Sequence, residues 1–98
     1  GNKMVTGIKI KQNNREQEIP VQGVFVEIGL IPSSDFIPLV KKNDLGEIEV
    51  DCRNATNVEG IFAAGDVTTV PEKQIIIAAG EGAKAALSAF RYLSRHKF

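Results

Sequence analysis

Apolar and polar residues alternate near the start of the chain in the pattern of short strands. In "MVTGIKI" (residues 4–10) the alternation is typical of a half-buried strand with an irregularity at Gly7. Asn13 and Asn14 follow, and asparagine tolerates the positive φ angles of a tight turn. We therefore expect residues 17–20 to pair back on the first strand.

The next segment, "VQGVFVEIGL" (residues 21–30), is almost continuously apolar. Such a run predicts a strand that is covered on both faces. With the two segments before it, it predicts an antiparallel β-meander. Gly29, Pro32 and two serines then mark an irregular stretch, so we expect a boundary or hinge near Gly29 to Pro32.

Two more short strands are predicted in the second half of the chain. "EIEVD" (residues 47–51) alternates, and "GIFAAGD" (residues 60–66) has the apolar run of a buried parallel strand. Ligands of open α/β sheets bind at the carboxyl ends of strands, where Asp66 could accept a hydrogen bond from a sugar-like hydroxyl. Gly65 would let that ligand approach the backbone closely. In the alternative interpretation, Asp66 only starts a turn or caps a helix.

From Glu72 onward apolar residues recur at every third or fourth position. They form a stripe about five helical turns long: Ile76, Ala79, Ala83, Ala86, Phe90 and Leu93. The stripe predicts one long C-terminal helix. Thr69 and Glu72 have the spacing of a capping box, although Pro71 allows the helix to start as late as Gln74.

The same stretch contains a competing motif. Residues 80–85, "GEGAKA", have the G-x-G-x-x-A spacing of a dinucleotide fingerprint, which requires a strand before it and a βαβ unit around it. The apolar stripe passes through Gly80 without a change of phase. We therefore expect Gly80 and Gly82 inside one helix. Glycine there costs about 1 kcal/mol relative to alanine, which suggests a closely packed neighbour.

Composition narrows the classes of function. The 98 residues carry equal numbers of acidic and basic side chains, without a long block of either sign, so we expect no nucleic-acid partner. No apolar run approaches the roughly 18 residues of a membrane-spanning helix, so we expect no membrane partner and a cytoplasmic location. Cys52 is the only cysteine, which excludes an internal disulfide and a C-x-x-C redox pair. We assign no metal site and no catalytic residue.

Two segments resemble a known family. "EGIFAAGDVTTVPEKQIIIAAGEGAKAALSAFRYL" (residues 59–93) is similar to the C-terminal flavin-binding signature of the thioredoxin reductase family, and "GVFVEIGLIPSSDF" (residues 23–36) is similar to its segment where the chain leaves the pyridine-nucleotide domain. "VPEKQIIIAAGEGAKA" particularly resembles the flavoprotein reductase subunits of alkyl hydroperoxide reductase systems. The resemblance covers essentially the whole chain.

This resemblance implies an α/β chain that is the C-terminal part of a two-domain FAD/NAD(P)-binding enzyme, a flavin-dependent NAD(P)H:disulfide oxidoreductase. Residues 1–30 would close the NAD(P)H-binding domain with a meander, and residues 31–98 would complete the FAD-binding domain. The chain alone would be inactive and would hold neither FAD nor NAD(P)H tightly. Implied partners are the missing N-terminal part, a second copy in a homodimer, and thioredoxin, a glutaredoxin-like protein or a peroxiredoxin as electron acceptor.

The resemblance also implies cofactor-binding residues. Asp66 would hydrogen-bond to the ribityl chain of FAD, with Gly65 permitting that approach and Val67 beside it. Three residues would line the flavin ring at the start of the final helix, where the family often has Arg-Gln-Ala: Lys73, Gln74 and Ile75. Lys73 and Ile75 differ from the family's Arg and Ala, so the resemblance implies their position beside the flavin but not their side-chain contacts.

Two alternatives stay open. The acceptor could belong to a peroxiredoxin or alkyl hydroperoxide system instead of being thioredoxin, because the acceptor-facing dithiol is not in these residues. The chain could also be a non-enzymatic small α/β module that binds a protein partner.

Overall fold

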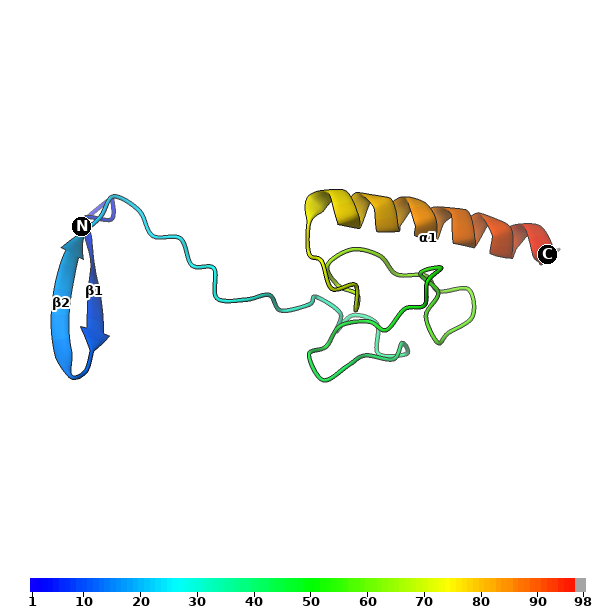
Figure 1. Cartoon of the computed structure of the whole chain (residues 1–98), viewed down its shortest axis with the longest axis horizontal. Coiled ribbons are helices and arrows are strands. Elements are labelled where there is room, and N and C mark those ends of the chain that lie inside the picture. Colours follow the sequence, from blue (N-terminus) through cyan, green and yellow to red (C-terminus); the bar gives the residue numbers. More distant parts are fainter. Residues whose placement is uncertain (97–98) are drawn as a thin grey trace.

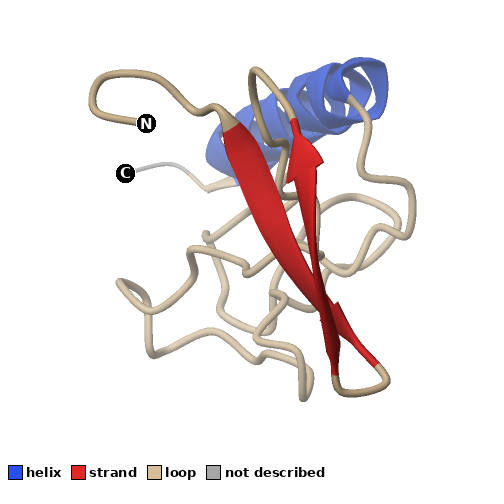
Figure 2. Cartoon of the chain, turned by 90° about the vertical axis from the view of Figure 1, so that its left-hand side faces the viewer, coloured by secondary structure: helices blue, strands red, loops and turns tan. Residues whose placement is uncertain are grey.

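The computed structural model describes residues 1–96, which form a β-hairpin, an extended connection and a loop-rich region under one long helix (Figure 1). The hairpin consists of β1 (Gly7–Gln12) and β2 (Arg15–Pro20), and the helix is α1 (Ile75–Arg95). The radius of gyration is 20.5 Å, whereas a compact domain of this size has about 13 Å. The molecule is therefore elongated, with the hairpin at one end (Figure 1), and Figure 2 views it from that end, with the hairpin in front.

The hairpin forms around the predicted asparagine turn. Asn13 and Asn14 have φ angles of 50° and 59°, as in the two-residue turns that suit the twist of paired strands. The antiparallel register places Lys11 opposite Glu16, and opposite charges on facing positions stabilise a strand pair. The predicted strand pair is confirmed, although both strands lie closer to the turn than expected.

The third strand of the predicted meander is not formed within residues 1–96. Residues 21–33 run as an extended connection between the hairpin and the rest of the chain (Figure 1). Phe25 and Ile28 are each 92% exposed. A strand needs a neighbour for its N–H and C=O groups, and no described residue pairs with this segment in a ladder. The prediction of a strand covered on both faces is therefore wrong for these residues.

The short strands predicted at residues 47–51 and 60–66 are reduced to single bridges. Ile48 pairs in antiparallel fashion with Lys42 and in parallel fashion with Thr68, and Phe62 pairs with Ala55. Turns separate these bridges, so no ladder extends beyond one residue pair. The region is held by backbone and side-chain hydrogen bonds between turns and loops instead of by an extended sheet.

The buried core is small. Among the described residues, Val40 and Ile48 are the buried hydrophobic side chains. Four polar residues are also buried: Ser34, Asn54, Thr68 and Ser88. A core of this size contributes little hydrophobic free energy.

Helix α1 begins at Ile75, one residue after the latest predicted start. Gln74 is the N-cap residue and makes no side-chain capping bond, so the capping box of Thr69 and Glu72 does not form. Gly80 and Gly82 lie inside the helix, as predicted. A Cβ added at either glycine would meet no atom within 4 Å. The closely packed neighbour expected there is therefore not among the described residues.

The predicted apolar stripe lies on the solvent-facing side of α1. Its larger side chains are exposed there, with Ile76 78%, Phe90 67% and Leu93 55% accessible. The side chains that meet the loops are mostly smaller and are buried or half-buried: Ala78, Glu81, Ala85, Ser88 and Tyr92. Within residues 1–96, no helix has the length and apolar character needed to cross a membrane.

Candidate functional site

A tight turn at Gly65 packs against the first turn of α1. The Thr68 hydroxyl and backbone N–H both donate to the Gly65 carbonyl, at 2.7 and 3.0 Å. Gly65 has φ 82°, a conformation that costs other residues free energy. A Cβ at Gly65 would lie 3.6 Å from the Ala78 side chain. The predicted strand end and the helix start are therefore adjacent.

Asp66 is exposed at this turn. It lines a pocket of about 260 Å³ where the extended connection reaches the turn. Apart from Asp66, its walls come from apolar residues and one serine: Leu30, Ile31, Pro32, Ser33 and Val67. The carbonyl of Val67 accepts a hydrogen bond from Ile48 N at 2.8 Å. Asp66 is thus the one charged group on the wall of a mainly apolar pocket.

The N-terminus of α1 is open. Gln74 has an extended backbone (φ −129°, ψ 147°), and the first turn has neither a side-chain cap nor an acidic residue. The first helical bond runs from Ala78 N to Gln74 O at 2.9 Å. Ile75 is 93% exposed. The free N–H groups and the positive end of the helix dipole can therefore receive an electron-rich group.

Lys73 turns toward the loop beneath the helix. Its Nζ lies 2.9 Å from Glu47 Oε1 and also donates to the Thr68 carbonyl. Asn43 Nδ2 donates to the other Glu47 oxygen at 2.7 Å. The hydrogen bonds from Lys73 and Asn43 hold the pKa of Glu47 below its ordinary value. Of the three predicted flavin-lining residues, Lys73 is thus already engaged, whereas Gln74 and Ile75 are exposed.

A second polar contact, which has no counterpart among the sequence-based predictions, joins the loops to α1. Asn54 is fully buried, and its Nδ2 donates to Ala63 O at 3.0 Å and to Glu81 Oε2 at 2.7 Å. Lys84 pairs with the other Glu81 oxygen at 2.9 Å, and these two contacts lower the pKa of Glu81, Lys84 more strongly. Asn54 has φ 63°. In the sequence, the one signal for this position is the preference of asparagine for turns with positive φ.

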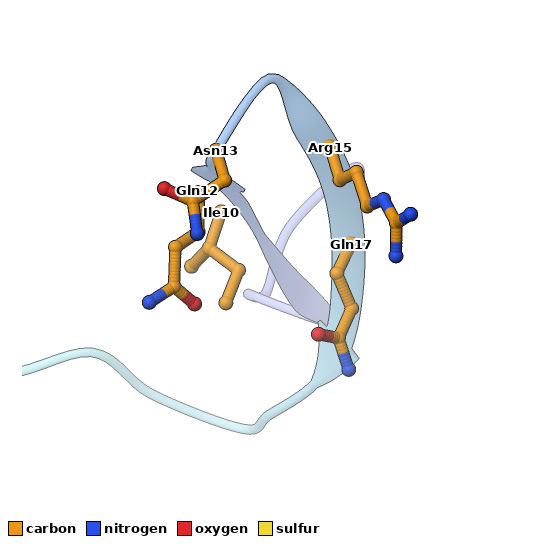
Figure 3. A pocket seen from close by; sticks show the side chains of 5 residues that line it. All are labelled: Ile10, Gln12, Asn13, Arg15 and Gln17. Atoms are coloured by element: carbon orange, nitrogen blue, oxygen red, sulfur yellow. The ribbon is translucent and has the colours of Figure 1, made fainter.

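A concavity on the hairpin has no connection with these residues. About 520 Å³ of space lies between side chains of β1, β2 and their turn (Figure 3): Ile10, Gln12, Asn13, Arg15 and Gln17. No other element contributes to it. We do not regard it as a functional site.

The sequence matches a known protein family over most of its length. Residues 2–86 match the family described as "Pyridine nucleotide-disulphide oxidoreductase". The chain belongs to this family. Among its relatives, an alkyl hydroperoxide reductase subunit of Pseudomonas putida is 50% identical over 94 residues, which are 93% of this chain and 18% of the relative. The corresponding Escherichia coli K12 protein is 59% identical over 80 residues, 81% of this chain and 15% of the relative.

Solved structures agree with the family. Thioredoxin reductase of T. acidophilum is 44% identical with a TM-score of 0.76, over 88% of this chain and 30% of that one. The Lactococcus lactis thioredoxin reductase is 32% identical with a TM-score of 0.78, over 93% of this chain and 31% of that one. The predicted resemblance and the thioredoxin reductase-like α/β fold are confirmed. The chain spans about a fifth of the curated relatives that it matches and less than a third of these structures.

Proposed function

We propose that this chain is the C-terminal FAD-binding portion of a flavin-dependent NAD(P)H:disulfide oxidoreductase. Family membership and the small share of the relatives that it spans support this proposal. Residues 1–30 belong to the NAD(P)H-binding domain and residues 31–98 to the FAD-binding domain. The extended connection between the hairpin and the α1 region supports that division. Alone, the chain is inactive and holds neither cofactor tightly.

The adjacency of the Gly65 turn and the open start of α1 carries the proposal. The exposed Asp66 carboxylate accepts a hydrogen bond from a ribityl hydroxyl of FAD, and Gly65 leaves room for the approach. FAD held there would supply hydride acceptance from NAD(P)H and electron transfer to a disulfide. The partial positive charge at the start of α1 stabilises negative charge placed against it.

The remaining candidate residues divide by role. Gln74 and Ile75 offer the exposed surface for the flavin ring, with Val67 on the wall beside Asp66. Lys73 acts as a positioning residue, because its ammonium group is held by Glu47 and the Thr68 carbonyl. It therefore fixes the helix start without contacting the cofactor.

The similarity to the alkyl hydroperoxide reductase proteins favours an acceptor of the peroxiredoxin type. Those relatives are 50% and 59% identical to this chain, compared with 44% and 32% for the two thioredoxin reductases. Thioredoxin or a glutaredoxin-like acceptor is the less supported choice. The exposed apolar stripe of α1 supports burial against the rest of the enzyme or a second copy in a homodimer, and we place this enzyme in the cytoplasm.

A chimera tests the function. This chain replaces the matching 94-residue segment of the Pseudomonas putida relative, and flavin absorbance and nicotinamide nucleotide oxidation are measured. The chimera is expected to carry FAD and to oxidise the nucleotide, whereas the isolated chain and the truncated relative do neither. Stoichiometric FAD on the isolated chain, or full flavin content in the truncated relative, would overturn the proposal.

A further inference from the structure

Three of the chain's four arginines line one pocket beside the C-terminal turns of α1. The pocket has a volume of about 250 Å³ and lies between the helix and the loop before it. Its basic and aromatic walls come from six residues: Arg53, Phe62, Arg91, Tyr92, Arg95 and His96. The chain has no net charge, so this gathering of positive charge is local.

The positive charge of the pocket is only partly offset within residues 1–96, where three arginines and one carboxylate, that of Asp51, line it. None of the three arginines makes an ion pair there. The Asp51 carboxylate accepts the backbone N–H groups of Arg53 and Ala55 at 2.8 and 2.9 Å, and it also attracts the Arg53 side chain. Glu59 lies 3.3 Å from His96 Nε2. Guanidinium groups that face one space repel one another unless an anion lies between them.

The aromatic wall is held in place by packing. The Tyr92 ring stacks on His96 with centroids 4.1 Å apart and meets Phe62 edge-on at 6.2 Å. A Cβ at Gly60 would lie 3.5 Å from the Tyr92 ring, so the loop rests directly on it. Ser88 also lines the pocket, is 6% exposed, and has a hydroxyl without a partner among the described residues. The pocket is therefore preformed.

We propose that this pocket binds a small phosphate-bearing anion. The arginine fork pairs with phosphate oxygens through two parallel hydrogen bonds, and three guanidinium groups suit a multiply charged group better than a single carboxylate. Pockets for drug-sized ligands have roughly 300–1,000 Å³, so this smaller pocket fits a phosphate or pyrophosphate group and not a whole dinucleotide.

The pocket is separate from the proposed flavin site. Gln74 is at the opposite end of α1, and a 21-residue helix is about 30 Å long. The anion site therefore does not depend on the proposed FAD site, and flavin content reports on one site without reporting on the other.

The test titrates inorganic phosphate, pyrophosphate and ribose 5-phosphate, at ionic strength balanced with chloride, into the isolated chain and into the chimera. Calorimetry follows binding in both proteins. In the isolated chain, which has one tyrosine and no tryptophan, Tyr92 fluorescence reports directly on the pocket wall. Saturable binding is expected in both proteins, and the tightest of the three probes tells free phosphate from esterified phosphate.

Variants of the arginines test whether these side chains bind the anion. Arg91→Gln and Arg95→Gln should each weaken binding about ten-fold, the effect of losing one charged hydrogen-bond pair. Arg15→Gln on β2 is the matched control and should bind normally. The flavin content of all chimeras should stay unchanged. The proposal would be overturned by absence of saturable binding, by unchanged binding in a variant that combines Arg91→Gln and Arg95→Gln, or by binding to the chain that disappears in the chimera.

Discussion

The Lys73 ammonium group lies 2.9 Å from the Glu47 carboxylate, and this pair joins the start of α1 to the loop beneath it. Both side chains are only 18% exposed. Because Lys73 also donates to the Thr68 carbonyl, the same group fixes the turn that begins at Gly65. Lys73 thus holds the helix start and the Gly65–Asp66 turn in one arrangement, although it does not itself line the pocket at Asp66.

Lys73→Met should lower the melting temperature and weaken FAD binding by the chimera, because the helix start and the turn lose their common partner. Lys41→Met is the matched control. The Lys41–Glu49 pair has side chains 66% and 39% exposed, and such surface pairs contribute about 0–1 kcal/mol. Thermal unfolding and flavin titration check the difference. Equal effects of the two variants would show that Lys73 has no positioning role.

Stability should fall in acid. Three carboxyl groups have lowered pKa values: Glu47, Asp51 and Glu81. The leading causes are hydrogen bonds from Lys73, from the backbone N–H of Ala55 and from Lys84, respectively. In the unfolded chain these groups titrate near their ordinary values of about 3.9 for Asp and 4.3 for Glu. The unfolded state therefore binds more protons as the pH falls toward these values.

This stabilisation is fully present above about pH 5 and is lost as the pH falls through the lowered folded-state pKa values. Urea unfolding of the chimera between pH 7 and pH 3 measures it. Glu47→Gln should make the decline in acid shallower. An unchanged slope of stability against pH in that variant would show that Glu47 does not contribute to the loss of stability in acid.

Gly65→Ala should destabilise the turn by about 1–2 kcal/mol, because a side chain disfavours the left-handed backbone there. The added Cβ itself meets Ala78 at an ordinary contact distance of 3.6 Å, so the backbone is the main cause. Gly23→Ala is the control, since Gly23 has no positive φ and a Cβ there meets nothing within 4 Å. Denaturant unfolding compares the two. Similar stability in both variants would contradict the strained turn.

Asn54→Gly should cost about 1–3 kcal/mol, because glycine keeps the φ of 63° but loses the hydrogen bonds to Ala63 and Glu81. Asn54→Ala should cost about 1–2 kcal/mol more, since alanine also disfavours that backbone. Asn2→Ala at the exposed N-terminus should be neutral. Unfolding free energies rank the three variants. A glycine variant as stable as the unchanged chain would show that the buried amide is dispensable.

The hairpin and the helix could be predicted because their signals are local. Asn13 and Asn14 favour positive φ angles wherever they stand, and the stripe from Ile76 to Leu93 needs only helical spacing. The buried face of α1 could not be predicted in this way. An apolar pattern shows which residues a folded protein buries, but not which part of the protein covers them. Within residues 1–96 small side chains such as Ala78 make the contacts instead.

The candidate site could be predicted only in part. The Gly65–Asp66 pair follows an apolar run, and the helix start after it was expected, so their adjacency could be proposed. The contact between Asn54 and Glu81 spans 27 positions and has no periodic signal, and the Lys73–Glu47 pair is equally remote in sequence. Strand formation at residues 21–30 depends on a pairing partner that the described residues do not supply.

The most direct test of the proposed function is the dissociation constant of FAD for the Asp66→Ala chimera. Losing a charged hydrogen-bond acceptor should weaken FAD binding about ten- to hundred-fold, whereas Asp44→Ala, in an exposed loop position, should bind FAD like the unchanged chimera. An Asp66→Ala chimera that binds FAD as tightly as the Asp44→Ala control would contradict the assignment of this turn to the flavin site.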